Sequence, residues 1–295
     1  MLNRFRVALL LWSVSLAQSH GATRVLSAAY PEGPLWQGER LYFAEMRADR
    51  VTLSEGAGGH VFFAQKGCGP TAIAPYGQGF LILCHLGARL VAVDSAGREL
   101  RRWQSDATGK ALRDPNDASA DTSGGVYFSD PGEFSRRSRP QGHVMYLSAS
   151  GELKSVTRRL WYPNGVYVAA DWLYVSEHLR GRVLRYRINA PGVLGAAETF
   201  VDLSKVARPR RYELDYELTG PDGLEIGPDG DLYVAIYGEG RVLRFSQSGE
   251  LHGIIEAPTR YLTNIAFSAH GMALTGAFDN ATPLSPGEVR IDAAP

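Results

Sequence analysis

The fold is decided by residues 164–186, NGVYVAADWLYVSEHLRGRVLRY. In this stretch, short runs of β-branched and aromatic residues are separated by Gly, Asn and Asp, which is the pattern of successive β-strands joined by turns. The pattern returns in residues 222–245, DGLEIGPDGDLYVAIYGEGRVLRF. A third copy begins at Asn116 and continues through residues 125–130 and 142–147. The chain is therefore expected to repeat one unit of short strands.

The spacing of the copies predicts the fold class. Their start points are 48 and 58 residues apart, and a period of about 40 to 50 residues with several strands per unit is typical of a propeller blade. We expect an all-β, six-bladed β-propeller with four-stranded antiparallel blades, and a β-sandwich pair is the alternative. The inner strands are expected to open at Glu32, Gly69, Asn116, Asn164, Asp222 and Asn264. Residues 23–29 are expected to pair with the last blade and close the ring, because an unpaired blade leaves exposed edges.

Four phrases of the repeat each put one oxygen-bearing side chain, Glu32, Asn116, Asn164 or Asp222, on a turn: Glu32-Gly33-Pro34, Pro115-Asn116-Asp117, Pro163-Asn164-Gly165 and Pro221-Asp222-Gly223. Each phrase is expected on a tight turn just before a strand. Equivalent places in a ring converge on its axis, where two carboxylates and two amides would form a site for a hard cation such as calcium. No His or Cys shares this set, which argues against a dedicated zinc cage. The alternative is that these residues only form turns.

The repeat also predicts the mouth of this site. If the inner strands start at one face, the second strands end there. Residues expected around the mouth as substrate contacts are Glu45, His85, Asp130, His178 and Tyr237. Two long basic connections contain Arg136, Arg137, Arg139, Arg208, Arg210 and Arg211. Arginine forks suit a negatively charged substrate or a flat polar ring. The alternative is a pair of solvated loops with internal ion pairs.

Composition and the N-terminus predict an exported protein. The 295 residues carry 31 basic and 31 acidic side chains, so no excess of positive charge points to nucleic acid. Residues 1–22 resemble a signal peptide, with Arg4 and Arg6 before a short apolar stretch and small residues at two candidate cleavage sites. An uncleaved anchor is the alternative. Residues 23–295 are expected to form one domain without a membrane span, monomeric and periplasmic or secreted.

The two cysteines are a disulfide candidate. In an oxidising compartment a pair of cysteines favours a disulfide. Cys68 lies in a connection and Cys84 ends a strand at what we expect to be the same face. The bond would close a loop of about 15 residues, which corresponds to about 3 kcal/mol in the chain-entropy model.

Taken together, the motifs resemble the SMP-30/gluconolactonase/luciferin-regenerating family of six-bladed propellers. The resemblance runs from about Ala29 to Val289. Its marks are residues 32–36 (EGPLW), 116–117 (ND), 127–131 (YFSDP), 163–166 (PNGV), 221–223 (PDG) and 263–267 (TNIAF). The resemblance implies a divalent metal, usually calcium with Zn²⁺, Mn²⁺ or Mg²⁺ as alternatives. The implied ligands are Glu32, Asn164 and Asp222, and Asn116 matches a position that contacts metal in some members and substrate or water in others.

The resemblance implies hydrolysis of a lactone as a small-molecule substrate. The metal would polarise the carbonyl, and the catalytic residues would be Asp222, as base, and Asn116. A metal-bound carboxylate is a weak base, so His178 or His85 is an alternative. Animal members hold a sugar-like substrate with an Arg two residues before the first Asn. Here Arg113 is three residues before Asn116, which leaves the lactone open.

Three other functions compete with the lactonase. Related propellers with a similar four-ligand site hydrolyse phosphotriesters. Others, similar to strictosidine synthase, catalyse condensations without metal, but the set of Glu32, Asn164 and Asp222 argues against that class. The third alternative is a secreted, non-catalytic binding propeller with a structural calcium, because fold alone does not decide function.

Overall fold

β-strands make up nearly all of the regular structure, and the all-β prediction is confirmed. The structure is a computed structural model that describes residues 23–55, 58–135, 139–206, 219–282 and 284–294. Helical elements in these ranges are short: η1 (Met46–Ala48), η2 (His178–Arg180) and α1 (Leu203–Val206). Over the same ranges, no helix has the length and apolar character needed to cross a membrane.

Four of the five sheets are four-stranded and antiparallel, with each strand paired to the next along the chain. The first contains β2 (Pro31–Gln37), β3 (Arg40–Glu45), β4 (Arg50–Glu55) and β5 (Gly58–Ala64). The second contains β6 (Pro70–Tyr76), β7 (Gly79–Cys84), β8 (Arg89–Val93) and β9 (Glu99–Trp103). The third contains β10 (Ala118–Ala120), β11 (Val126–Asp130), β12 (His143–Leu147) and β13 (Leu153–Ser155). The fourth contains β14 (Pro163–Ala169), β15 (Trp172–Glu177), β16 (Arg182–Ala190) and β17 (Val193–Asp202).

The fifth sheet has eight strands in two four-stranded arrays. One array contains β18 (Gly220–Ile226), β19 (Leu232–Tyr237), β20 (Arg241–Phe245) and β21 (Leu251–Glu256). The other contains β22 (Tyr261–Ser268), β23 (Gly271–Ala277), β24 (Pro286–Asp292) and β1 (Arg24–Ala29). The register that joins the two arrays is the pair Tyr237 and Tyr261. β1 pairs with β24 along its whole length, so the predicted pairing of the N-terminal segment with the end of the chain is confirmed.

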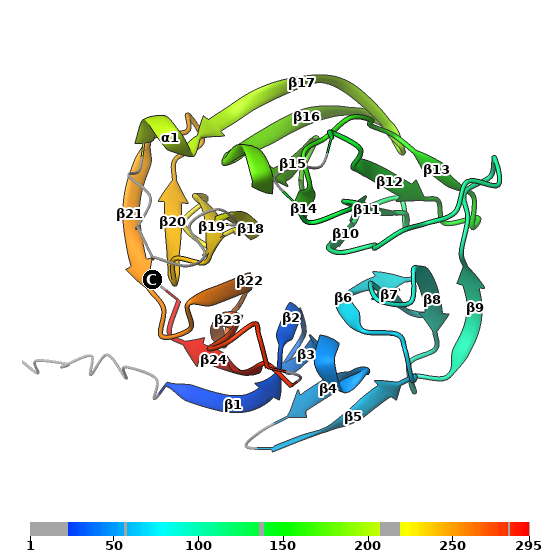
Figure 1. The fold of residues 1–295 in the computed structure, drawn as a ribbon, viewed down its shortest axis with the longest axis horizontal. Helices are drawn as coiled ribbons and strands as arrows, with labels where there is room; N and C mark the ends of the chain where they lie inside the picture. The colour runs from blue at the N-terminus through cyan, green and yellow to red at the C-terminus, as the bar shows by residue number, and fades with distance from the viewer. Residues whose placement is uncertain (1–22, 56–57, 136–138, 207–218, 283, 295) are drawn as a thin grey trace, which may run out of the picture.

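The sheets lie around a common centre, with the first strand of each repeat innermost (Figure 1). The apolar core lies in layers between neighbouring sheets. In β7, Leu81 and Leu83 pack toward the third sheet, whereas Ile82 and Cys84 pack toward the first. This division follows from the two-residue period of a strand, and it requires a continuous apolar run where both faces are covered. Leu41 of β3 belongs to the layer that also contains Val289 of β24.

Three of the four oxygen-bearing phrases sit at bulges inside the first strands, not on turns before them, whereas Asn116 lies just before β10. The register of β2 shifts between Glu32 and Leu35, that of β14 between Pro163 and Val166, and that of β18 between Pro221 and Leu224. β6 and β22 shift at the corresponding place, at Thr71 and at Thr263. The prediction that Gly69 and Asn264 open strands was therefore misplaced by one or more residues. A bulge leaves a residue unpaired and redirects its side chain, which a sequence pattern reads as a turn.

Candidate active site

Three bulges and the segment before β10 bring the predicted ligands to one cavity of about 320 Å³. Glu32, Asn164 and Asp222 line it from three sheets, and Asn116, just before β10, lines it from a fourth. All four side chains belong to residues that are more than nine-tenths buried. The structure therefore places these four residues at one cavity, and their roles as ligands stay a prediction.

Two glycines permit this close approach of strands. A Cβ on Gly165 would lie 2.2 Å from the carbonyl O of Asp222, and one on Gly223 would lie 2.0 Å from Oδ1 of Asn264. No side chain fits at such distances, so each ligand position in these two strands is followed by Gly. The Asn-Gly and Asp-Gly pairs thus reflect crowding at the centre and not turn formation.

The site is strongly acidic for a buried position. Burial, followed by the charge of Asp117, raises the pKa of Glu32 well above its usual range. Burial, followed by the charges of Glu32 and Asp117, does the same for Asp222. Such shifts arise because a carboxylate loses its hydration in the interior and repels its like-charged neighbours. A cation held between Glu32 and Asp222 would offset both effects.

Asn164 gives an independent test of whether a metal fits. Its Oδ1 is buried and has no hydrogen-bond partner, although buried polar atoms are almost always paired. Carbonyl and carboxylate oxygens are the donors that calcium takes, so the residues present fit a hard divalent cation. Across the described residues, no group of three or more His, Cys, Asp or Glu side chains is arranged to hold a metal. The candidate set differs from such a group because two of its four members, Asn116 and Asn164, are amides.

Asp117 is a third acidic residue that the sequence interpretation did not assign to the site. Its Oδ2 accepts a hydrogen bond from the backbone N of Val166 over 2.9 Å, and its Oδ1 accepts from Nδ2 of Asn264 over 3.1 Å. Burial raises its pKa to about 6. These contacts tie the third, fourth and last repeats together beneath the cavity. The signal was present in the phrase Asn116-Asp117, where only the first residue was taken as a ligand.

Three of the predicted substrate contacts line the cavity wall: His85, His178 and Tyr237. Each directly follows the residue that pairs with the proline before a bulge, namely Cys84, Glu177 and Ile236. The imidazole Nδ1 of His85 lies 3.1 Å from the carbonyl O of Asp114, and that of His178 lies 3.1 Å from the carbonyl O of Pro221. Because a carbonyl only accepts, both rings carry the proton on Nδ1.

Glu45 and Asp130 do not line the cavity. Glu45 pairs with Pro31 and so lies one residue before the wall position, where a side chain points to the other face. Its carboxylate accepts hydrogen bonds from Arg50, from Thr52 Oγ1 and from the backbone N of Ala29. Asp130 Oδ1 accepts from the backbone N of Arg113 and of Asp114. Both carboxylates therefore secure connections behind the cavity.

Arg113 is exposed and also lies outside the cavity lining. Its substrate-binding role stays a prediction, as does that of Glu45 and Asp130. Arg136, Arg137, Arg208, Arg210 and Arg211 lie outside the described residues, and so does the predicted signal peptide.

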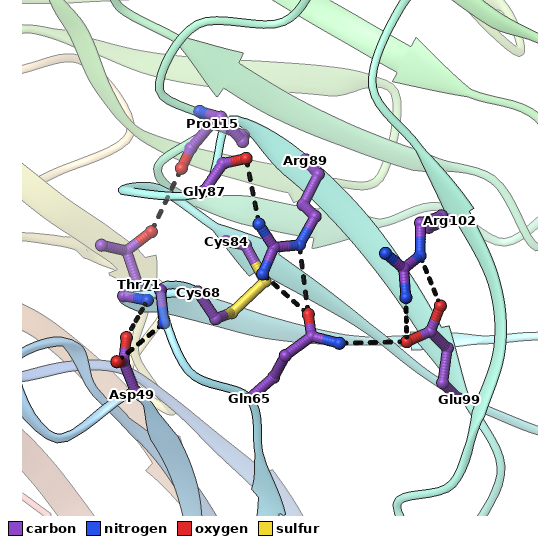
Figure 2. Close-up of a disulfide and its surroundings, with 12 residues drawn as sticks. Asp49, Gln65, Cys68, Thr71, Cys84, Gly87, Arg89, Glu99, Arg102 and Pro115 are labelled. Atoms are coloured by element: carbon purple, nitrogen blue, oxygen red, sulfur yellow. Dashed lines mark hydrogen bonds and ion pairs between the residues drawn. A yellow bond between two sulfur atoms is a disulfide. The ribbon is translucent and has the colours of Figure 1, made fainter.

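Cys68 and Cys84 form a disulfide (Figure 2), and Cys84 directly precedes the lining residue His85. The bond joins the end of β7 to the connection before β6. The same connection is held by Asp49, which accepts hydrogen bonds from the backbone N of Gly67 and Gly69 over 2.8 and 2.7 Å. The next residue after Cys84 is His85, whose backbone N donates to the carbonyl O of Gly69 over 3.1 Å. The disulfide thus fixes the backbone that presents His85.

The wall also contains aromatic residues that the sequence interpretation missed: Tyr30, Phe134 and Tyr162. The two tyrosines each precede a proline and a ligand, in Tyr30-Pro31-Glu32 and Tyr162-Pro163-Asn164. That repeated Tyr-Pro pair was an available signal. Phe134 lies in the connection after β11, where no periodic pattern exists to place it.

The sequence pattern of the family described as SMP-30/Gluconolactonase/LRE-like region matches residues 30–275. The chain belongs to this family. Curated relatives include Lactonase drp35 of Staphylococcus haemolyticus (strain JCSC1435), which is 30% identical over 220 residues. Lactonase drp35 of Staphylococcus saprophyticus subsp. saprophyticus is 31% identical over 221 residues. Each match covers 70% of this chain, and the chain spans 62% of the relative's own length.

Solved structures of the family share the fold. A luciferin-regenerating enzyme superposes with a TM-score of 0.72 at 18% identity, covering 92% of this chain and 95% of its own. The gluconolactonase XC5397 of Xanthomonas campestris gives 0.72 at 22% identity, covering 94% and 92%. A regucalcin of Agrobacterium tumefaciens, described as a calcium-binding protein, gives 0.71 at 20% identity, covering 92% and 93%.

Proposed function

We propose that this protein is a divalent-metal-dependent hydrolase that opens lactones. Family membership and relatives named as lactonases support the reaction class. The observation that carries the proposal is the buried, unpartnered Oδ1 of Asn164 in the same cavity as the Glu32 and Asp222 carboxyls. Oxygen donors of this kind suit a hard cation, and Asn164 Oδ1 has no hydrogen-bond partner among the described residues.

The metal is proposed to be calcium, held by Glu32, Asn116, Asn164 and Asp222. The donor set contains only carboxylate and amide oxygens, and the similar regucalcin is described as calcium-binding. When bound, a divalent cation supplies Lewis-acid polarisation of a substrate carbonyl and stabilises negative charge on its oxygen.

Of the chain's own residues, His85 is suited to remove a proton from the attacking water. Burial lowers its pKa, so the ring is neutral at pH 7. With Nδ1–H donating to the carbonyl O of Asp114, the lone pair is on Nε2, the arrangement a general base needs. Asp222 would be a weak base while it binds a cation. We therefore assign Asp222 to the metal and proton removal to His85.

The protein is further proposed to be an exported, six-bladed ring. Four four-stranded sheets and the two arrays of the fifth sheet give six blades, and the β1–β24 pairing supports closure of the last. Packing of Leu41 in the layer of Val289 supports contact between the first blade and the last. The Cys68–Cys84 disulfide supports an oxidising compartment, periplasmic or extracellular, because such bonds are rare in the cytosol.

The proposal is tested by assaying δ-valerolactone and glucono-δ-lactone with calcium and with excess chelator. We expect turnover with calcium and its loss in chelator. Asp222→Asn should lower kcat/KM by more than about 100-fold, with weaker metal binding by calorimetry. His85→Gln should lower kcat by about 100-fold at unchanged metal content, the usual range for loss of a general base. Asp171→Asn, at an exposed ion pair with Arg187, is the matched control.

Two outcomes would change the assignment. Full activity of Asp222→Asn with metal bound would remove Asp222 from the mechanism. Stabilisation by calcium without turnover of any lactone, or of a phosphotriester tested in parallel, would identify a calcium-binding propeller instead of an enzyme.

A further inference from the structure

We call the four predicted metal ligands the floor of the cavity and the other lining residues its wall. The wall contains six apolar or aromatic residues, Tyr30, Met46, Leu86, Phe134, Tyr162 and Tyr237, and five polar ones, Arg47, Thr71, His85, His178 and Asn280. Phe134 and Leu86 keep 37% and 56% of their surface exposed at the entrance. Apolar walls with a few convergent polar groups are typical of small-molecule sites, and the wall chemistry sets the ligand class.

The aromatic side chains of the wall form one contact network. The ring centre of Phe134 lies 4.7 Å from that of Tyr162 and 5.2 Å from that of His178. It lies 6.4 Å from that of Tyr237 with the planes nearly perpendicular. Rings at these separations offer both faces and edges to a flat guest, which is the geometry in which aromatic groups attract one another.

Most polar atoms on the wall are already engaged with each other or with the backbone. The hydroxyls of Tyr30 and Tyr237 are 2.9 Å apart, and Nδ2 of Asn280 donates to the Tyr237 hydroxyl over 3.2 Å. The Thr71 hydroxyl donates to the carbonyl O of Asn116 over 2.7 Å. A polyhydroxylated ring needs a partner for every buried hydroxyl, because an unpaired one costs binding energy. Arg47 is the lining residue with a guanidinium group, and this group lies 5.9 Å from the centre of the Tyr30 ring, within the range of a cation–π contact.

Backbone geometry gives an independent reason to assign a role to two of these rings. Tyr30 and Tyr162 have φ angles of 51° and 53°, in the left-handed region that disfavours a bulky residue. Gly69, with φ 50°, takes the same place in the second sheet. All three carbonyls accept a hydrogen bond from the backbone N of the wall residue: Met46, His178 and His85, respectively. Gly would meet the backbone requirement without strain, so the two tyrosines point to a use for their side chains.

We propose that the cavity selects lactones that carry a flat aromatic ring over polyhydroxylated sugar lactones, with Phe134 and Tyr162 as the specificity-determining residues. This inference rests on the proposed lactonase function. The ester group would face the polar floor, and the aromatic ring would pack against Phe134 and Tyr162, whose own rings are in contact with their centres 4.7 Å apart. Arg113 lies outside this wall.

The test compares three six-membered lactones: isochroman-3-one, δ-valerolactone and glucono-δ-lactone. The first two have primary alkoxide leaving groups, so the benzo ring is their main difference. We expect kcat/KM for isochroman-3-one to be at least about tenfold above that for δ-valerolactone, with glucono-δ-lactone lowest. Phe134→Ala should raise KM for isochroman-3-one by about three- to tenfold, the range of one lost aromatic contact. It should change KM for δ-valerolactone by less than about twofold.

Phe278→Ala is the matched control, because Phe278 is also exposed, at 49%, but does not line the cavity. This replacement should leave KM unchanged for both isochroman-3-one and δ-valerolactone. Phe134→Tyr should restore the preference, since it keeps the ring. Phe134 is itself partly exposed, so its replacement is not expected to prevent folding.

A binding measurement separates failure of this inference from failure of the proposed function. Calorimetry compares the affinity for the non-hydrolysed lactam 1,4-dihydroisoquinolin-3-one with that for δ-valerolactam. The difference measures the contribution of the aromatic ring to binding without any turnover. Better turnover of glucono-δ-lactone than of isochroman-3-one would overturn the inference and leave the lactonase intact. Absence of all turnover would overturn the lactonase. In that case, tighter binding of the aromatic lactam that Phe134→Ala abolishes would support the ligand class, and equal binding of the two lactams would refute it.

Discussion

Replacing Asn164 with Ala should stabilise the metal-free protein and at the same time destroy its response to calcium. In the structure, Oδ1 of Asn164 is buried without a partner, and leaving such a group unpaired costs about 1–3 kcal/mol. The variant removes the amide and opens space only toward an existing cavity of about 320 Å³. We therefore expect the free energy of unfolding in chelator to rise by about 1 kcal/mol.

Calcium should reverse the order of the two proteins. At a free concentration 100 times its Kd, a ligand stabilises the folded state by about 2.7 kcal/mol. If loss of the Asn164 ligand weakens binding a hundredfold, the same calcium concentration stabilises the variant by only about 0.4 kcal/mol. The wild type would then be the more stable protein in calcium and the less stable one in chelator.

Urea unfolding followed by tryptophan fluorescence, in chelator and in millimolar calcium, measures both effects. Thr71→Val is the matched control, because Thr71 occupies the corresponding bulge but its hydroxyl donates to the carbonyl O of Asn116. The free energy of unfolding of Thr71→Val should be about 1 kcal/mol below that of the wild type, both in chelator and in calcium. A loss of stability in chelator for Asn164→Ala as large as that for Thr71→Val would refute the reasoning, since Asn164 would then be a structural residue.

Two further predictions concern stability. Reduction of the Cys68–Cys84 disulfide, whose cysteines are 16 residues apart, should lower the free energy of unfolding by about 3 kcal/mol and Tm by roughly 6–12 °C. The Cys68→Ala, Cys84→Ala protein should not respond to reductant. An unchanged Tm in protein shown by mass to be reduced would contradict this prediction. Glu225 lines a second cavity, and burial raises its pKa from 4.5 to about 8. The folded state thus holds a proton that the unfolded state releases above pH 4.5, so stability falls as pH rises toward 8. Glu225→Gln should be about 1–2 kcal/mol more stable than wild type at pH 9, a figure that allows for the partial exposure of this side chain, and equally stable at pH 4. The free energy of unfolding is measured by urea titration across this pH range. The same pH dependence in both proteins would refute the prediction.

The strands and the four oxygens were predictable because both depend on local sequence. The apolar and aromatic run of residues 232–237 and a proline before Asn164 or Asp222 are visible without any knowledge of contacts. The reason for Gly165 was not visible, because it depends on the carbonyl O of Asp222, 57 residues further along the chain. The Asn-Gly pair, which is common in turns, here allows two strands to pack closely.

The wall was only half predictable because side-chain direction depends on register. Glu45 and His85 both seemed to end second strands, yet Glu45 pairs with Pro31 whereas His85 follows the pair Pro70–Cys84. A shift of one residue reverses the face to which a side chain points. Phe134 illustrates a different limit: it reaches the cavity from a connection, where neither strand nor helix periodicity constrains direction.

The equivalent bulges also explain how a repeated backbone produces a site at a single place. At two of the bulges a threonine satisfies itself within the chain: Thr71 donates to the carbonyl O of Asn116, and Thr263 donates to that of Pro31. At the Asn164 bulge the side-chain oxygen has no partner, and at the Glu32 and Asp222 bulges the carboxyl pKa is raised by burial and by like charge. Backbone geometry is shared among these positions, so it cannot select the ligands. Selection follows from which side chains the fold leaves electrostatically unsatisfied, and those are the side chains whose energy a cation would lower most.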